Sequence, residues 1–277
     1  MSRSQVIVLA ASAVVVVGLA LMPRAVVKNN NKQVEGTTAE AAAPAQKDTQ
    51  PTTHQANIPA EVLSNIEAQK EVYNTAGDER EKRAGLDELI ATFKEINRYD
   101  SAAYYAEQFS IEYPKSAYIL KAGDIYYEAF TFALDAEKVA EMAKKTQQLF
   151  EKYLEANPKD LDVKVKLGMT YVPTANPMQG IAMIREVLNE EPDQKLALFN
   201  LGLLAIQSGQ FDKGVGRFKR LTELDKEDMQ SWFYLGLCYK ETGKEAEAIE
   251  VLEHVKKNVK EPQIITSVNQ YLEELKH

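Results

Sequence analysis

The sequence predicts an all-α protein built as an α-solenoid, in which helical hairpins stack and bury a continuous core. Three observations lead to this prediction. Helix-forming residues dominate the 277 positions, and only 13 Gly and 10 Pro interrupt them. Apolar residues recur at helical spacing, and no segment is typical of a β protein. Finally, similar units of 34 residues begin at positions 161, 195 and 229.

The unit from Met229 to Pro262 is the clearest. It predicts one helix ending near the Thr242-Gly243 turn and a second running from Glu245 to about Val259. Its characteristic residues are the run Trp232-x2-Leu235-Gly236-x2-Tyr239, followed by Ala248 and Leu252. The small residues in this run allow two antiparallel helices to approach closely. The pattern resembles the tetratricopeptide repeat, and this resemblance implies a right-handed superhelix of helix-turn-helix hairpins.

An uninterrupted apolar run of 17 residues, Val6 to Met22, follows a short N-tail of residues 1–5. This length is at the lower limit for a transmembrane helix, so we expect a single-pass membrane anchor or uncleaved signal anchor. Gly18-x-Ala20 also fits a cleaved secretory signal. Both interpretations place the rest of the chain outside the cytoplasm, in the periplasm if the protein is bacterial. Arg24, Lys28 and Lys32 leave a cytoplasmic orientation open.

Residues 23–58 have low hydrophobicity and no apolar period, which predicts a disordered tether. The repeat domain is expected to cover residues 59–277. Its first helix should begin at Pro59 and end near the Thr75-Ala76-Gly77 segment.

Five repeats follow that helix, at about 83–116, 117–160, 161–194, 195–228 and 229–262, with a capping helix at 263–277. The second repeat is ten residues longer than the period, so we expect both of its helices to be longer and the hairpin to protrude by roughly 7 Å. The aromatic residues of its first helix are predicted to belong to the core rather than to a ligand platform: Tyr118, Tyr126, Tyr127, Phe130 and Phe132. The capping helix should cover the last hairpin with Ile264, Ile265, Val268, Leu272 and Leu275.

The sequence offers no catalytic or metal-binding constellation, and we expect a protein that is not an enzyme and needs no cofactor. Its histidines, His54, His254 and His277, are too dispersed for a triad or a metal cluster, and no phosphate-binding Gly loop is present. The single cysteine, Cys238, lies within a predicted helix and is interpreted as a small buried residue. A net charge of −8 argues against nucleic acid as a partner.

The resemblance implies that the first helix of each repeat lines a concave groove. The corresponding positions are mostly apolar, and the candidate partner-binding residues are Val165, Met169, Val172, Leu196, Phe199, Leu203, Ile206, Phe233 and Leu237. We therefore expect a membrane-tethered scaffold or chaperone-like module that binds an apolar or amphipathic segment of a protein or peptide partner.

Two alternatives qualify this expectation. Members of the family that clamp a C-terminal carboxylate present Lys, Asn and Arg in the groove, whereas only Asn200 fits here, and Val165, Gln230 and Tyr234 occupy the basic positions. A carboxylate clamp is therefore not expected. The second alternative is a structural protein that self-associates into a homo-oligomer and organises a complex at the membrane.

Overall fold

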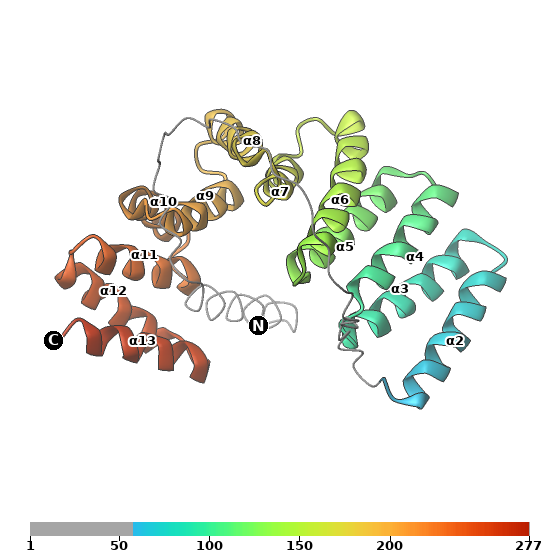
Figure 1. Cartoon of the computed structure of the whole chain (residues 1–277), viewed down its shortest axis with the longest axis horizontal. Coiled ribbons are helices and arrows are strands. Elements are labelled where there is room, and N and C mark those ends of the chain that lie inside the picture. The colour runs from blue at the N-terminus through green and yellow to red at the C-terminus, as the bar shows by residue number, and fades with distance from the viewer. Residues whose placement is uncertain (1–57, 277) are drawn as a thin grey trace, which may run out of the picture.

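The computed structural model of the protein describes residues 58–276, and within this range it contains twelve α-helices and no strand (Figure 1). The helices are α2 (Ala60–Thr75), α3 (Glu79–Glu95), α4 (Tyr99–Glu112), α5 (Ser116–Phe132), α6 (Ala136–Ala156), α7 (Leu161–Tyr171), α8 (Pro177–Glu190), α9 (Lys195–Gln207), α10 (Phe211–Leu224), α11 (Met229–Glu241), α12 (Glu245–Asn258) and α13 (Pro262–Glu274). The predicted all-helical class is confirmed for the described residues.

Consecutive helices form antiparallel hairpins, which follow one another along an arc from α2 to α13. In Figure 1, α7, α9 and α11 lie toward the inside of this arc, and α8, α10 and α12 lie toward the outside. The last hairpin has the predicted helices, since α11 ends at Glu241 and α12 begins at Glu245. The arrangement is an α-solenoid, as expected from the repeated pattern.

Aspartate side chains define the start of several helices. Asp78, Asp135, Asp160 and Asp228 each accept a hydrogen bond from the backbone N–H three residues later, at 2.7–3.2 Å. Such an N-cap satisfies one of the free amides at a helix start and stabilises it by about 1 kcal/mol. The caps fix where α3, α6, α7 and α11 begin.

The core repeats from hairpin to hairpin. Each second helix, from α4 to α12, places one large apolar side chain at the same position between its neighbours, and each of these side chains is at most 1% exposed: Phe109, Phe150, Ile184, Phe218 and Leu252. In four of these five hairpins, the residue of the first helix that faces this large side chain is a glycine. In the last hairpin, a Cβ added to Gly236 would lie only 2.8 Å from Leu252, which is the close approach that the sequence predicts.

The second repeat contains the longest hairpin in the described part of the chain. Helices α5 and α6 have 17 and 21 residues, compared with 11–14 residues in α7 to α12. Four of its five aromatic side chains are buried or pack against the core, as predicted. The prediction is wrong for Phe132, which is 41% exposed and stacks on Tyr99 with ring centroids 4.5 Å apart. Phe132 is the last residue of α5 and lies past the end of the buried seam.

The predicted membrane segment, Val6 to Met22, and residues 23–57 of the predicted tether lie outside the described residues. None of the helices from α2 to α13 combines the length and the apolar character needed to cross a bilayer.

Candidate protein-binding groove

The nine candidate groove residues come from three consecutive first helices. Helix α7 and the residue after it contribute Val165, Met169 and Val172, α9 contributes Leu196, Phe199, Leu203 and Ile206, and α11 contributes Phe233 and Leu237. These helices lie next to one another on the inner side of the arc. Helix α9 therefore forms the middle of the candidate surface.

Two of the nine residues belong to the core instead, and for them the sequence-based assignment needs correction. Val165 is 0% exposed and packs with Ile184 and Ala197. Phe233 is 6% exposed, and its ring lies 6.0 Å from that of Tyr271 on α13. Both side chains fill the seam with the following element and are unavailable to a partner. The other seven are partly buried, so each keeps an accessible portion.

Phe199 is held in place by an aromatic cluster beneath it. Its ring meets those of Phe218 and Tyr234 edge to face, at centroid distances of 5.9 and 5.8 Å. Tyr234 is 3% exposed, and its burial, together with the nearby Tyr271 hydroxyl, raises the pKa of its phenol to about 12. Tyr234 therefore remains uncharged at neutral pH, and the surface around Phe199 has an apolar floor.

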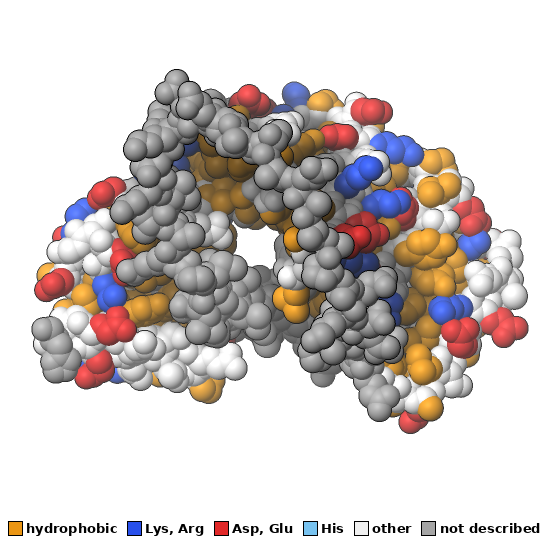
Figure 2. Space-filling model, in the orientation of Figure 1, with side chains coloured by type: hydrophobic (Ala, Val, Ile, Leu, Met, Phe, Trp, Pro, Cys, Tyr) orange, Lys and Arg blue, Asp and Glu red, His pale blue; other side chains and the backbone are white. Residues whose placement is uncertain are grey.

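The inner side is different at the N-terminal hairpins, where ion pairs connect successive first helices. Lys94 of α3 lies 2.5 Å from Glu128 of α5, Lys121 of α5 contacts Asp87 of α3, and Lys166 of α7 lies 2.7 Å from Asp124 of α5. Figure 2 shows charged side chains over α5 and α6 and hydrophobic side chains on the inner wall between α7 and α9. Exposed pairs of this kind contribute at most about 1 kcal/mol each, but they leave little uncompensated charge.

The sequence carried a signal for these ion pairs. Asp87 and Lys121 are separated by 34 residues, as are Lys94 and Glu128. Opposite charges one period apart fall on equivalent positions of adjacent first helices and can pair. Comparing equivalent positions for charge would have divided the inner side into a charged part and an apolar part.

Two further residues of interest turn out to be structural. Asn200, the one residue that fits a carboxylate clamp, is 8% exposed, and its Nδ2 donates a hydrogen bond to the Leu196 carbonyl oxygen at 2.8 Å. Cys238 is 0% exposed, as predicted, and burial followed by the nearby Glu241 raises the pKa of its thiol to about 12. Its thiol is therefore protonated at neutral pH and a poor nucleophile. Residues 58–276 include no group of three or more His, Cys, Asp and Glu side chains that could hold a metal ion.

Comparison with known proteins supports a repeat of the tetratricopeptide type. Residues 199–258, from α9 to the end of α12, match the family model described as tetratricopeptide repeat. A crystal structure of a tetratricopeptide repeat protein from Parabacteroides merdae superimposes with a TM-score of 0.53 at 16% sequence identity, covering 78% of this chain and 82% of that one. At this identity the similarity concerns the fold alone.

Two other solved structures are more distant in geometry. YrrB, described as a tetratricopeptide repeat protein with an unusual peptide-binding site, gives a TM-score of 0.43 at 18% identity and covers 76% of this chain and 97% of its own. MamA gives a TM-score of 0.45 at 14% identity and covers 62% of this chain and 89% of its own. A comparison with curated proteins gave no match.

Proposed function

We propose that the protein is a non-enzymatic interaction module that binds an apolar or amphipathic segment of a partner protein on the inner side of its solenoid. The observation that supports this most directly is the row of accessible apolar side chains on α7, α9 and α11: Met169, Val172, Leu196, Phe199, Leu203, Ile206 and Leu237. With packed helices about 8–10 Å apart, three first helices present a row of roughly 20 Å. This length suits a partner helix of about 13 residues.

The charges near this row favour an apolar partner. Lys240, at the end of α11, is paired with Glu274 at 2.9 Å and with Glu241 at 3.4 Å. Burial of Lys240 disfavours its charged form, but the hydrogen bond with Glu274 and the negative charge of Glu274 outweigh this effect. The pKa of Lys240 is therefore raised. A segment bound here gains mainly from removing apolar surface from water, so its affinity should change little with salt.

The test compares partner capture by the full chain in detergent with capture by Leu203→Lys/Leu237→Lys. Lysine keeps an aliphatic stem against the underlying core and places its ammonium in water, so the fold is retained while the surface gains two charges. Phe199 is left unchanged because it supports Phe218 and Tyr234. The control is Leu134→Lys/Met178→Lys, at two side chains that are 101% and 63% exposed and lie outside the row.

Partners retained by the control and lost by Leu203→Lys/Leu237→Lys would support the groove as the binding surface, provided that both variants melt like the wild type by circular dichroism. Identical partner lists for all three proteins would contradict the proposal.

The second part of the proposal is that Val6 to Met22 holds this module at a membrane, with its soluble part outside the cytoplasm. The run of 17 apolar residues is long enough to span a thin bilayer, and a flexible tether of residues 23–58 would let the repeats range about 30 Å from it. The wild-type protein should remain in membranes washed at alkaline pH, and Val14→Lys/Val16→Lys should release it. Recovery of the wild type in the soluble fraction would contradict a retained anchor.

A further inference from the structure

The outer side of the solenoid carries opposite charges on two neighbouring helices. Helix α10 presents Lys213, Arg217 and Arg220, whereas α12 presents Glu247, Glu250 and Glu253. All are exposed except Arg217, which is partly buried. Lys213 and Glu247 are separated by 34 residues and so occupy equivalent positions in consecutive hairpins. The charge of the outer surface therefore reverses over one repeat.

Most of these charges have no ionic partner within the described part of the chain. Ion pairs in this region join Arg220 to Asp193 and Glu223, Lys195 to Asp225, and Lys240 to Glu241 and Glu274. Lys213 instead contacts the uncharged Gln210, and Arg217 has only a long 3.5 Å contact with the Lys213 carbonyl oxygen. Burial, reinforced by the Arg185 guanidinium, lowers the pKa of Arg217. A carboxylate placed beside Arg217 would relieve this cost.

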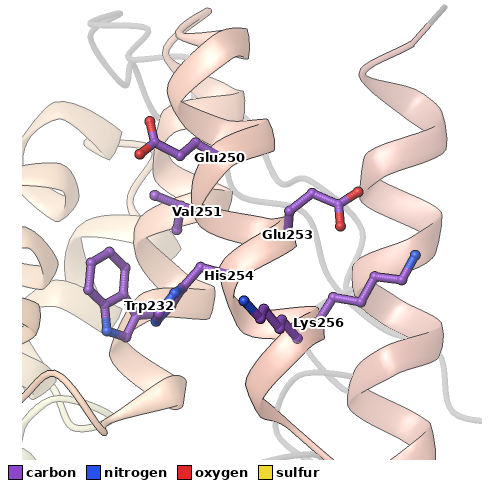
Figure 3. A pocket seen from close by; sticks show the side chains of 7 residues that line it. Trp232, Glu250, Val251, Glu253, His254 and Lys256 are labelled. Carbon is purple, nitrogen blue, oxygen red and sulfur yellow. The ribbon is translucent and has the colours of Figure 1, made fainter.

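A hollow of about 670 Å³ lies beside the acidic helix. It is lined by Trp232 of α11 and by six residues of α12, namely Glu250, Val251, Glu253, His254, Lys256 and Lys257. Figure 3 shows Glu250, Trp232 and His254 on the same side of α12. The Trp232 and His254 rings are 4.7 Å apart. An aromatic face beside a carboxylate favours the side chain of an arginine or a lysine, through cation–π attraction and charge-assisted hydrogen bonds.

We propose that this outer surface binds a second copy of the same chain, with α10 of each protomer against α12 of the other. Helices α10 and α12 are second helices of adjacent hairpins and run in the same direction. A two-fold axis that runs parallel to these helices therefore places each α10 against the other protomer's α12 in parallel orientation, and one closed interface contains this contact twice.

The order of charges along the two helices fits this parallel arrangement. When Arg217 lies opposite Glu250 of the second copy, Arg220 lies opposite Glu253, and Lys213 falls within one residue of Glu247. The match continues outside this central set, because Glu223 lies opposite Lys256. Opposite charges thus meet from Lys213 to Glu223 of α10.

Other occupants satisfy only half of this surface. A nucleic acid or another polyanion could approach α10, but the glutamates of α12 and the net charge of −8 would repel it. An acidic segment of another protein would leave α12 and its hollow uncovered. A second copy supplies both signs in the required order. Because the outer surface lies opposite the proposed groove, this inference does not depend on the proposed function.

Charge reversal provides a direct test on the full chain in detergent, using sedimentation equilibrium under density-matched conditions. One variant is Lys213→Glu/Arg217→Glu, and the other is Glu247→Lys/Glu250→Lys. Wild type should be a dimer whose affinity falls by roughly tenfold or more when the salt concentration rises from about 0.1 M to about 1 M, since the Debye length shrinks from ~10 to ~3 Å. Each variant alone should be monomeric, because like charges then face each other in both contacts.

An equimolar mixture of the two variants should recover the dimer, since only the heterodimer brings opposite charges together at both contacts. Lys144→Glu/Lys152→Glu, on exposed positions of α6, has the same charge change as the first variant and should dimerise like the wild type. Trp232 is the only tryptophan of the chain, so its fluorescence should shift for the wild type, the control and the mixture, and for neither charge-reversal variant alone. A wild-type monomer at all salt concentrations, dimers of either single variant, or a mixture that remains monomeric would each overturn the proposal.

Discussion

At the scale of single residues, Gly180 is the glycine with the least room for a side chain in the described part of the chain. A Cβ added to Gly180 of α8 would lie 2.1 Å from the carbonyl oxygen of Gly168 on α7, a distance that requires the backbones to separate. We expect Gly180→Ala to lower the free energy of unfolding by ~1–3 kcal/mol through overpacking. Urea denaturation followed by circular dichroism measures this change.

Gly216 is the matched control, because it also lies within a helix but its added Cβ would meet nothing within 4 Å. Gly216→Ala should stabilise the protein by about 0.5–1 kcal/mol, as alanine loses less conformational entropy than glycine on helix formation. A Gly180→Ala variant as stable as wild type would show that α7 and α8 do not pack through their backbones.

Residue types in the sequence predicted several of these packing details, but the accessibility of individual groove residues could not be predicted in the same way. Gly236 and Cys238 were interpretable because a small residue amid large apolar ones indicates a close contact. Val165 and Phe233 were assigned by repeat position, and both occupy the fifth position of their units. In these two units the fifth side chain packs against the next element, at Ala197 of α9 for Val165 and at Tyr271 of α13 for Phe233. Phe199, the fifth residue of the unit between them, keeps an accessible portion. Their burial depends on neighbours that a single repeat does not contain.

At the scale of elements, the start of a helix can be predicted from the sequence where a capping residue marks it. Helix α3 begins at Glu79, four residues before the expected start of the first repeat, because Asp78 caps it by accepting from the Glu81 N–H at 2.8 Å. An aspartate three residues before a glutamate is a recognisable start signal. The repeat period alone placed this boundary too late, since the period describes spacing between units and carries no information about the cap.

At the scale of the whole molecule, the core is a succession of clusters along the solenoid. One cluster joins α2 to α6, two smaller ones connect α5 through α9, and the last joins α9 to α13. In such a fold each hairpin is stabilised mainly by its neighbours, so stability varies along the chain. Damage to one end should then unfold that end first, while the other end stays folded.

Phe218 and Trp232 allow this expectation to be tested. Phe218 is 0% exposed at the centre of the last cluster, and Phe218→Ala should cost that region about 3–5 kcal/mol. Trp232 reports on the same region, whereas circular dichroism at 222 nm reports on all helices. In urea, the fluorescence transition of Phe218→Ala should therefore precede the circular dichroism transition. The equivalent change in the first cluster, Phe109→Ala, should leave the fluorescence transition near that of wild type. Coincident transitions in both variants would instead mean that the hairpins unfold as one cooperative unit, because neighbour coupling would then exceed the loss at any single position.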